Sequence, residues 1–219
     1  MTTVTAPKTG RRKAPRAARR QQLIDATMKC IARKGMGSTT LADVAREAGL
    51  SQGIVNLHFK SKENLLNETL QFLADEYKAQ FEKALRQSGP DPADKLFAVL
   101  ELDFKPRLCD PRKLAVWFAY WGEVKVQPAY RKICDEFDQA YDEVVIRLCA
   151  DIIEDGGYVG VTPQAAADAL TSMSNGLWLS CLISPRTWDR KNAMEAVLSY
   201  LRHVFPRHFS QRGSCAHRT

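Results

Sequence analysis

Hydrophobic residues recur with the 3.6-residue period of an α-helix along this chain, and no segment shows the alternation typical of a strand. The first periodic segment, residues 23–31, places its apolar side chains on one helical face, and Lys34-Gly35 marks its end. A second, shorter helix should follow, capped by Thr39 or Thr40. The pattern therefore begins with two helices separated by a short loop.

The next segment predicts a tight turn and a third short helix. Gly49 permits the left-handed backbone of the turn, and Ser51 can cap a helix that runs through His58. Ser61 then opens a long amphipathic helix over 62–87. Capping residues followed by proline mark later starts, so further helices are expected at 91–105, 111–124, 127–154, 162–184 and 189–205. The sequence predicts an all-α fold of about nine helices.

The basic charge of the chain is concentrated at one end. Residues 1–66 contain 13 Lys or Arg against 4 Asp or Glu, whereas residues 67–205 contain 16 against 21. A polyanionic partner would therefore bind at the N-terminal end. We expect a disordered basic arm at 1–19, a helix-turn-helix DNA-binding domain at 20–66, a ligand-binding and dimerisation domain at 67–206, and a flexible tail at 207–219.

The two short helices with their basic arm are typical of a DNA-binding protein. Polar side chains on the second short helix suit base edges, hydroxyls at helix starts suit phosphates, and nearby basic side chains suit the backbone. A pair of ordinary core helices is the alternative, but a core helix would be more apolar. The residues expected to contact DNA are Arg19, Arg20, Thr39, Thr40, Ser51, Gln52, Gly53, Asn56, His58, Lys60 and Lys62.

Aromatic residues gather at 117–121 in the second half of the chain. Aromatic side chains on a helix usually belong to the core, but several rings can also enclose a quaternary ammonium ion through cation–π attraction. Both interpretations remain open from the spacing alone. The candidate rings are Trp117, Tyr120, Trp121, Tyr130 and Trp178.

The run T-T-x-x-x-V-A-x-x-A-G-L-S-x-G-x-V-x-x-H-F-x-S-K-E-x-L-L, which begins at Thr39, resembles the DNA-binding domain of the TetR family of repressors. The resemblance implies a homodimer that binds a pseudo-palindromic operator in double-stranded DNA. Two half-sites about 34–36 Å apart also require two DNA-binding domains. The chain departs from the family at Asn56, where an aromatic residue is usual, so we expect Asn56 to bind a base.

Segments of the second half are similar to the C-terminal domain of BetI-type repressors, which respond to choline and control its conversion to glycine betaine. The matching segments are Phe118-Ala119-Tyr120-Trp121, Gln127-Pro128 with Tyr130-Arg131, and Asn175-Gly176-Leu177-Trp178-Leu179. Asn175 replaces an Asp of the family, so no charge is carried over to that position. The resemblance implies choline as effector, with Asn175 joining the aromatic residues as a ligand contact.

Other functions find little support in the sequence. There is no GxSxG, HExxH or glycine-rich phosphate loop, so we expect no catalytic site, cofactor or metal. Six scattered cysteines and the lack of an apolar leader or membrane span favour a cytoplasmic protein. Two alternatives stay open: a TetR-type repressor with a different small hydrophobic or cationic ligand, and a ligand-independent architectural DNA-binding protein.

Overall fold

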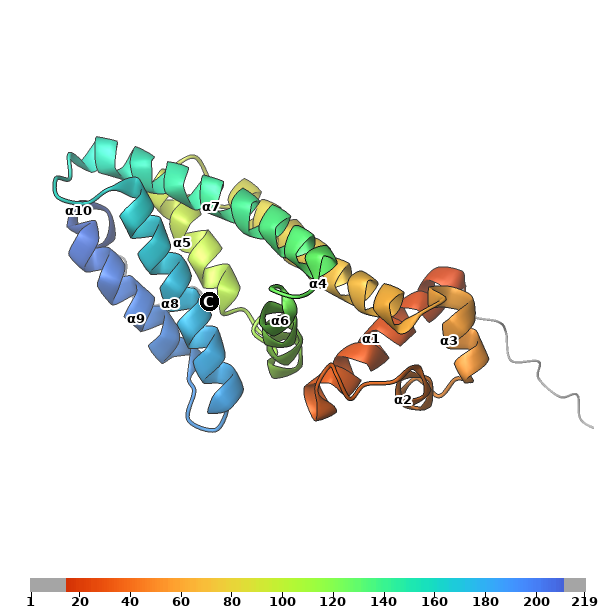
Figure 1. Ribbon diagram of the computed structural model, residues 1–219. Helices are drawn as coiled ribbons and strands as arrows, with labels where there is room; N and C mark the ends of the chain where they lie inside the picture. The colour runs from red at the N-terminus through yellow and green to blue at the C-terminus, as the bar shows by residue number, and fades with distance from the viewer. Residues whose placement is uncertain (1–14, 211–219) are drawn as a thin grey trace, which may run out of the picture.

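The computed structural model describes residues 15–210, and every regular element in that range is a helix (Figure 1). The all-α prediction is confirmed. The ten helices are α1 (Arg16–Lys34), α2 (Leu41–Glu47), α3 (Gln52–Phe59), α4 (Lys62–Gln87), α5 (Pro92–Asp103), α6 (Pro111–Glu123), α7 (Pro128–Gly156), α8 (Pro163–Ile183), α9 (Arg190–Val204) and α10 (Pro206–Phe209).

Side-chain caps define most of the helix starts. The Thr40 hydroxyl accepts a hydrogen bond from the Asp43 backbone and the Asp43 carboxylate accepts one from the Thr40 backbone, which forms a capping box at α2. Ser61 caps α4 by accepting from the Asn64 backbone. Proline occupies the first turn of α5, α6, α7 and α8, where its missing N–H is not needed.

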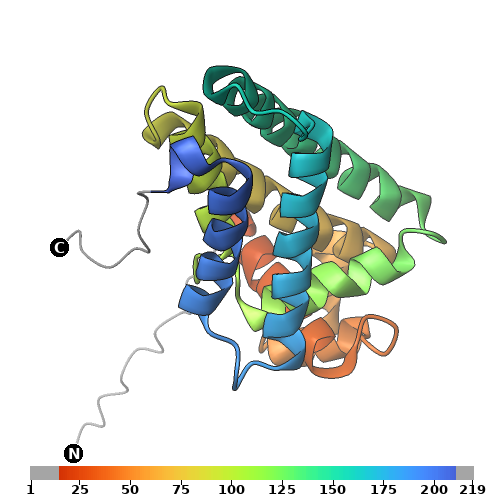
Figure 2. The ribbon, with the colours of Figure 1, turned by 90° about the vertical axis from the view of Figure 1, so that its left-hand side faces the viewer.

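The helices form an elongated molecule (Figure 1). The helices α1–α3 lie at one end and α8 and α9 at the other, with α4 running from the first group into the second. Rotation by 90° shows α8 and α9 side by side on the same face (Figure 2). Between the two groups α6 packs against α1. The position of α6 makes it a physical link between the two ends of the protein.

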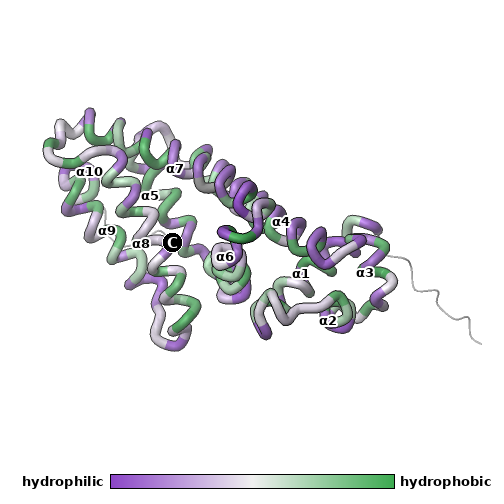
Figure 3. Tube along the Cα trace, viewed as in Figure 1, coloured by the Kyte–Doolittle hydropathy of each residue, from purple (hydrophilic) through white to green (hydrophobic). Residues whose placement is uncertain are grey.

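A continuous apolar core runs through both groups of helices. Hydrophobic and hydrophilic residues alternate along the helices, as expected where one face is buried and the other meets solvent (Figure 3). The five cysteines in the described range are buried and make no disulfide. No helix between residues 15 and 210 combines the length and apolar character needed to cross a membrane.

The structure differs from the predicted organisation at both ends of the described range. Helix α1 begins at Arg16, so residues 16–19 of the predicted arm are helical, while residues 1–14 lie outside the described range. The tenth helix, α10, occupies the start of the predicted tail. It forms because Phe209 is buried and the Arg207 guanidinium donates to the Gly156 carbonyl at the end of α7. The rest of the tail, 211–219, also lies outside the described range.

Candidate nucleic-acid interface and ligand cavity

Helix α3 lies at one end of the molecule (Figure 1). It presents a polar stripe to solvent. Val55 and Phe59 are buried and fix the inner face of the helix. The opposite face carries Gln52, Gly53 and Asn56, all exposed. Because an amide side chain can both donate to and accept from a base edge, this face has the chemistry for reading a major groove.

The ends of α3 carry two further residues of the predicted interface. Ser51 is exposed at the start of α3, where its hydroxyl makes no capping hydrogen bond. Lys60 is exposed at the end of α3 and has a positive φ of 44°. A hydroxyl and an ammonium group therefore flank the polar stripe, as a phosphate backbone on either side of a groove would require.

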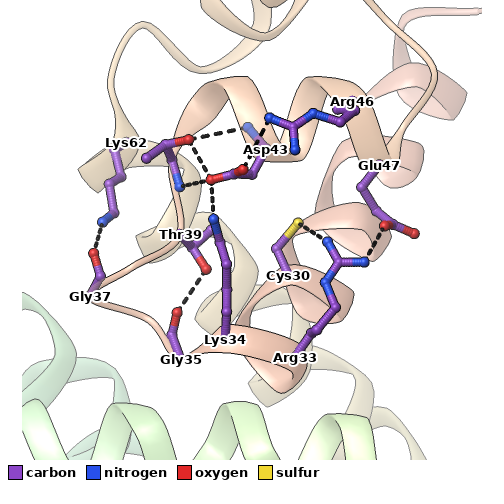
Figure 4. A network of polar contacts seen from close by, with 11 residues as sticks. Cys30, Arg33, Lys34, Gly35, Gly37, Thr39, Asp43, Arg46, Glu47 and Lys62 are labelled. Carbon is purple, nitrogen blue, oxygen red and sulfur yellow. Dashed lines mark hydrogen bonds and ion pairs between the residues drawn. The ribbon is translucent and has the colours of Figure 1, made fainter.

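The threonines before α2 are engaged within the protein. Thr39 is buried and its hydroxyl donates to the Gly35 carbonyl at 2.8 Å (Figure 4). Thr40 forms the cap of α2 with Asp43, to which Lys34 also donates a hydrogen bond. These hydrogen bonds, the one from Lys34 foremost, hold the pKa of Asp43 well below its usual range. The geometry assigns Thr39 and Thr40 a structural role, and the Thr39 hydroxyl is not placed to bind a phosphate.

Three basic residues of the predicted interface also have partners inside the protein. The Arg20 guanidinium pairs with Glu68 on α4 and lies 5.5 Å from the centre of the Phe59 ring. Arg19 donates to Gln22 at 2.7 Å, and the Lys62 ammonium donates to the Gly37 carbonyl at 3.0 Å (Figure 4). These contacts hold α1, α4 and the loop before α2 together.

His58 differs from the outward orientation expected from the sequence. Its side chain is half-buried beside Phe59, with 6.4 Å between the ring centres. Burial and the nearby charge of Arg16 lower the pKa of the His58 imidazole. The lowered pKa favours the neutral form of the His58 imidazole.

A cavity of about 300 Å³ lies among the helices of the second half. Five helices line it, because α4, α5, α6, α7 and α8 each contribute at least one side chain. Four of the side chains are aromatic, two are carboxylates, three are uncharged polar groups and none is basic. The lining residues are Tyr77, Asp103, Trp121, Tyr141, Asp142, Thr171, Ser174, Asn175 and Trp178.

Asp103 is the most deeply buried carboxylate of the cavity, with 2% of its surface exposed. Tyr77 donates a hydrogen bond to its carboxylate, and the Trp178 indole donates to its backbone carbonyl at 2.8 Å. Burial raises the pKa of Asp103 to about 6, although the Tyr77 hydrogen bond opposes this shift. Because burial makes the Asp103 carboxylate costly to ionise, a cation bound in the cavity would stabilise its charged form.

Three hydroxyl groups in the cavity wall lack a hydrogen bond of standard geometry: those of Tyr141, Thr171 and Ser174. The Tyr141 and Ser174 hydroxyls lie near enough to Asp103 to lower its pKa, but they are not aligned with it. Buried polar groups in this state are suited to bind a polar group of a ligand.

The predicted ligand contacts separate into two groups. Trp121, Asn175 and Trp178 meet at the cavity. Tyr120 is fully buried and donates to the Leu66 carbonyl at 2.6 Å, and Tyr130 packs against its ring with 4.9 Å between ring centres. Neither Tyr120 nor Tyr130 lines this cavity.

Trp117 is also buried outside the cavity, with its ring centre 6.3 Å from that of Trp121. Tyr120 lies about 100° around α6 from Trp121 and therefore faces the core. Trp117 shares the face of Trp121 but lies one turn earlier along the helix, outside the cavity. The geometry therefore assigns Trp117, Tyr120 and Tyr130 to packing.

Two family comparisons cover most of the described range. Residues 23–69 match the family described as bacterial regulatory proteins, tetR family. Residues 92–206 match the family described as BetI-type transcriptional repressor, C-terminal. This chain belongs to the BetI-type branch of the TetR family. It is thus a helix-turn-helix DNA-binding transcriptional regulator, and the expected family is confirmed.

Relatives of known name support the BetI-type assignment. The HTH-type transcriptional regulator BetI of Paraburkholderia xenovorans is 31% identical over 186 residues, which cover 85% of this chain and 93% of the relative. The regulator of the same name from Stenotrophomonas maltophilia is 32% identical over 170 residues, 77% of this chain and 83% of the relative.

Solved structures of transcriptional regulators share the fold. A putative regulator from Pseudomonas aeruginosa PAO1 has a TM-score of 0.77 at 24% identity and covers 90% of this chain and 96% of its own. A putative regulator from Saccharomonospora viridis, solved in complex with choline, has a TM-score of 0.73 at 20% identity. The match covers 85% of this chain and 97% of that regulator. At these identities the comparison shows the fold.

Sequence reasoning missed several cavity residues of this BetI-type protein. Asp103 carried a readable signal, since it ends an apolar helix and is followed at once by Phe104, a place where an unpaired charge is costly. Tyr77 lies on the apolar face of α4, where the pattern predicts a core residue and not a cavity wall. Tyr141 and Asp142 carry no such signal, because their helix is long and mixed in character and only the neighbouring helices show which face meets the cavity.

Proposed function

We propose that this protein is a repressor that binds an operator and is released by choline, and that it controls choline uptake or the conversion of choline to glycine betaine. One observation carries the proposal: the cavity combines aromatic rings with the carboxylates of Asp103 and Asp142 and has no basic side chain in its lining. A compact organic cation suits such a site better than an anion or a neutral apolar molecule.

The chemistry of choline matches each part of the lining. Its trimethylammonium group is a weakly hydrated cation that aromatic faces attract, and the rings of Trp121 and Trp178 are both at the cavity. Its hydroxyl can bond the poorly satisfied hydroxyls of Tyr141 or Ser174. The choline complex of the regulator from Saccharomonospora viridis supports the proposal, since that protein has the same fold.

We propose that two copies act together through α8 and α9. Helix α8 leaves Leu179 and Ile183 exposed, at 42% and 69% of their surfaces. Exposed apolar side chains on a helix beside another helix favour a bundle with the same pair from a second copy. Two-fold symmetry would then pair the two α3 helices, as a pseudo-palindromic operator requires.

Two helices connect the cavity directly to the DNA-binding helices. Trp121 lies on α6, which packs against α1, and Tyr77 lies on α4, which begins directly after α3. A ligand that fits the cavity better in one arrangement of α4 and α6 shifts the population toward that arrangement. The distance between the two α3 helices changes with it, and operator contacts are lost together.

Tryptophan fluorescence during a choline titration tests the ligand, with 3,3-dimethylbutan-1-ol as the matched neutral control. That alcohol has the shape of choline without its charge. We expect saturable quenching by choline, none by the alcohol, and a weaker response from Trp178→Phe. No response at millimolar choline, or an equal response to both compounds, contradicts the choline proposal and favours another ligand for the same repressor.

A gel shift with the DNA upstream of the protein's own gene tests the repressor. We expect preference for that DNA over a scrambled sequence, and release when choline is added. Equal binding to both sequences without any response to choline would instead favour an architectural DNA-binding protein.

A further inference from the structure

Leu57 borders the polar stripe of α3 and has 72% of its surface exposed. It follows Asn56 directly and is one helical turn beyond Gly53, so the exposed positions 52, 53, 56 and 57 form one face of α3. Among the described residues of α1–α4, it is the single large hydrophobic side chain this exposed. The other exposed positions of this face, Gln52, Gly53 and Asn56, carry no hydrophobic side chain.

The fold gives Leu57 no packing partner to explain its identity. It lies outside the apolar core, to which its neighbours Val55 and Phe59 belong. A leucine left in water contributes no burial energy to folding. The side chain is therefore free to contact whatever meets the outer face of α3.

The major groove of DNA displays one apolar group on its unmodified base pairs, the C5-methyl of thymine. Gly53, one turn before Leu57, has no side chain, and an added Cβ there would meet only the Ser51 hydroxyl, at 3.8 Å. The surface beside Leu57 is thus open, which lets the helix approach a base closely.

We propose that Leu57 contacts the C5-methyl group of one thymine in each operator half-site and so selects thymine at that position. The inference rests on the proposed operator binding and adds a specificity-determining residue to it. The amides of Gln52 and Asn56 would read neighbouring bases by hydrogen bonds, while Leu57 reads an apolar group that hydrogen bonds cannot distinguish.

Replacement of thymine by deoxyuracil removes only the methyl group and leaves base pairing intact. We would replace each thymine of the upstream DNA singly and measure affinity by fluorescence anisotropy. Since burial of one methyl-sized group is worth about 0.8 kcal/mol, one position in each half-site should lose about fourfold in affinity. Introduction of 5-methylcytosine in place of cytosine at that position should recover part of the affinity lost with cytosine.

Leu57→Ala is the deciding variant, because an exposed leucine can be replaced without harm to the core. It should bind thymine and deoxyuracil operators equally. Val126→Ala removes a similarly exposed side chain, 67% exposed, from the loop between α6 and α7 and should keep the discrimination of the unmodified protein. The penalty should also persist at higher salt, since the contact involves no phosphate.

Three results would overturn the inference. If no thymine position is sensitive, or if Leu57→Ala retains the sensitivity, Leu57 does not read a methyl group although the protein binds its operator. If the unmodified protein does not distinguish upstream from scrambled DNA, the proposed repressor function fails and the inference fails with it.

Discussion

Gly53→Ala should make the protein more stable and a weaker operator binder. Gly53 lies in the first turn of α3 without a positive φ, and an added Cβ would meet nothing closer than the Ser51 hydroxyl at 3.8 Å. The fold therefore does not need glycine there. Alanine in a helix is favoured over glycine by about 0.5–1 kcal/mol, which for a chain of this size raises Tm by about 1–4 °C.

The same methyl group would stand between α3 and the base edges. If the glycine exists for close approach to DNA, the intruding methyl should cost about 1–3 kcal/mol of binding, or about five- to 150-fold in Kd. Thermal unfolding followed by circular dichroism gives the first quantity, and anisotropy with labelled upstream DNA gives the second. We expect the unfolding temperature to rise and the affinity for the operator to fall.

Gly122→Ala is the matched control. Gly122 is exposed on α6, and a Cβ there would also meet nothing within 4 Å. It should gain similar stability and bind the operator as the unmodified protein does. A Gly53→Ala variant that binds the operator normally would refute the close-approach argument, and one that loses stability would refute the reading of the local geometry.

Three further predictions concern the cavity, the caps and the core. Choline affinity should fall about tenfold from pH 7 to pH 5, because protonation of Asp103 below its pKa of about 6 removes the charge that attracts the cation. Calorimetric titrations should show a weaker dependence of choline affinity on pH for Asp103→Asn. An equally steep dependence in that variant would contradict this role of Asp103. Thr40→Ala should destabilise the protein by about 1 kcal/mol in denaturant unfolding, whereas Ser51→Ala, which removes no capping bond, should leave stability unchanged and weaken operator binding. Tyr120→Phe should cost about 1 kcal/mol of stability and leave choline quenching intact, since its hydroxyl bonds the Leu66 carbonyl; lost quenching would place Tyr120 at the ligand.

Helix positions were predictable because their signals are local. Ser61 and the apolar stripe behind it predict a helix over 62–87, and α4 has those bounds. The Asp-Pro and Thr-Pro pairs place the starts of α5, α6 and α8 in the same way. A cap depends on residues within one turn, so the sequence contains all the information it needs.

The cavity was only partly predictable because it depends on which helices meet. The aromatic run on α6 indicates a place rich in rings, but Trp121 reaches the cavity and Tyr120 next to it does not. Similarly, a basic residue near a helix-turn-helix suggests a phosphate contact, whereas Arg20 finds Glu68 on α4. Distant partners of this kind leave no trace in the local pattern.

Asp103 joins parts of the molecule that could otherwise move apart. It ends α5, its carboxylate accepts from Tyr77 on α4, and its carbonyl accepts from Trp178 on α8. For the engineering of biosensors this arrangement separates two tasks. If the cavity binds a cation as we propose, substitutions at Trp121 or Asn175 would change which cation enters, while the junction at Asp103 would still connect the cavity to α4, the helix that leads to the DNA-binding end.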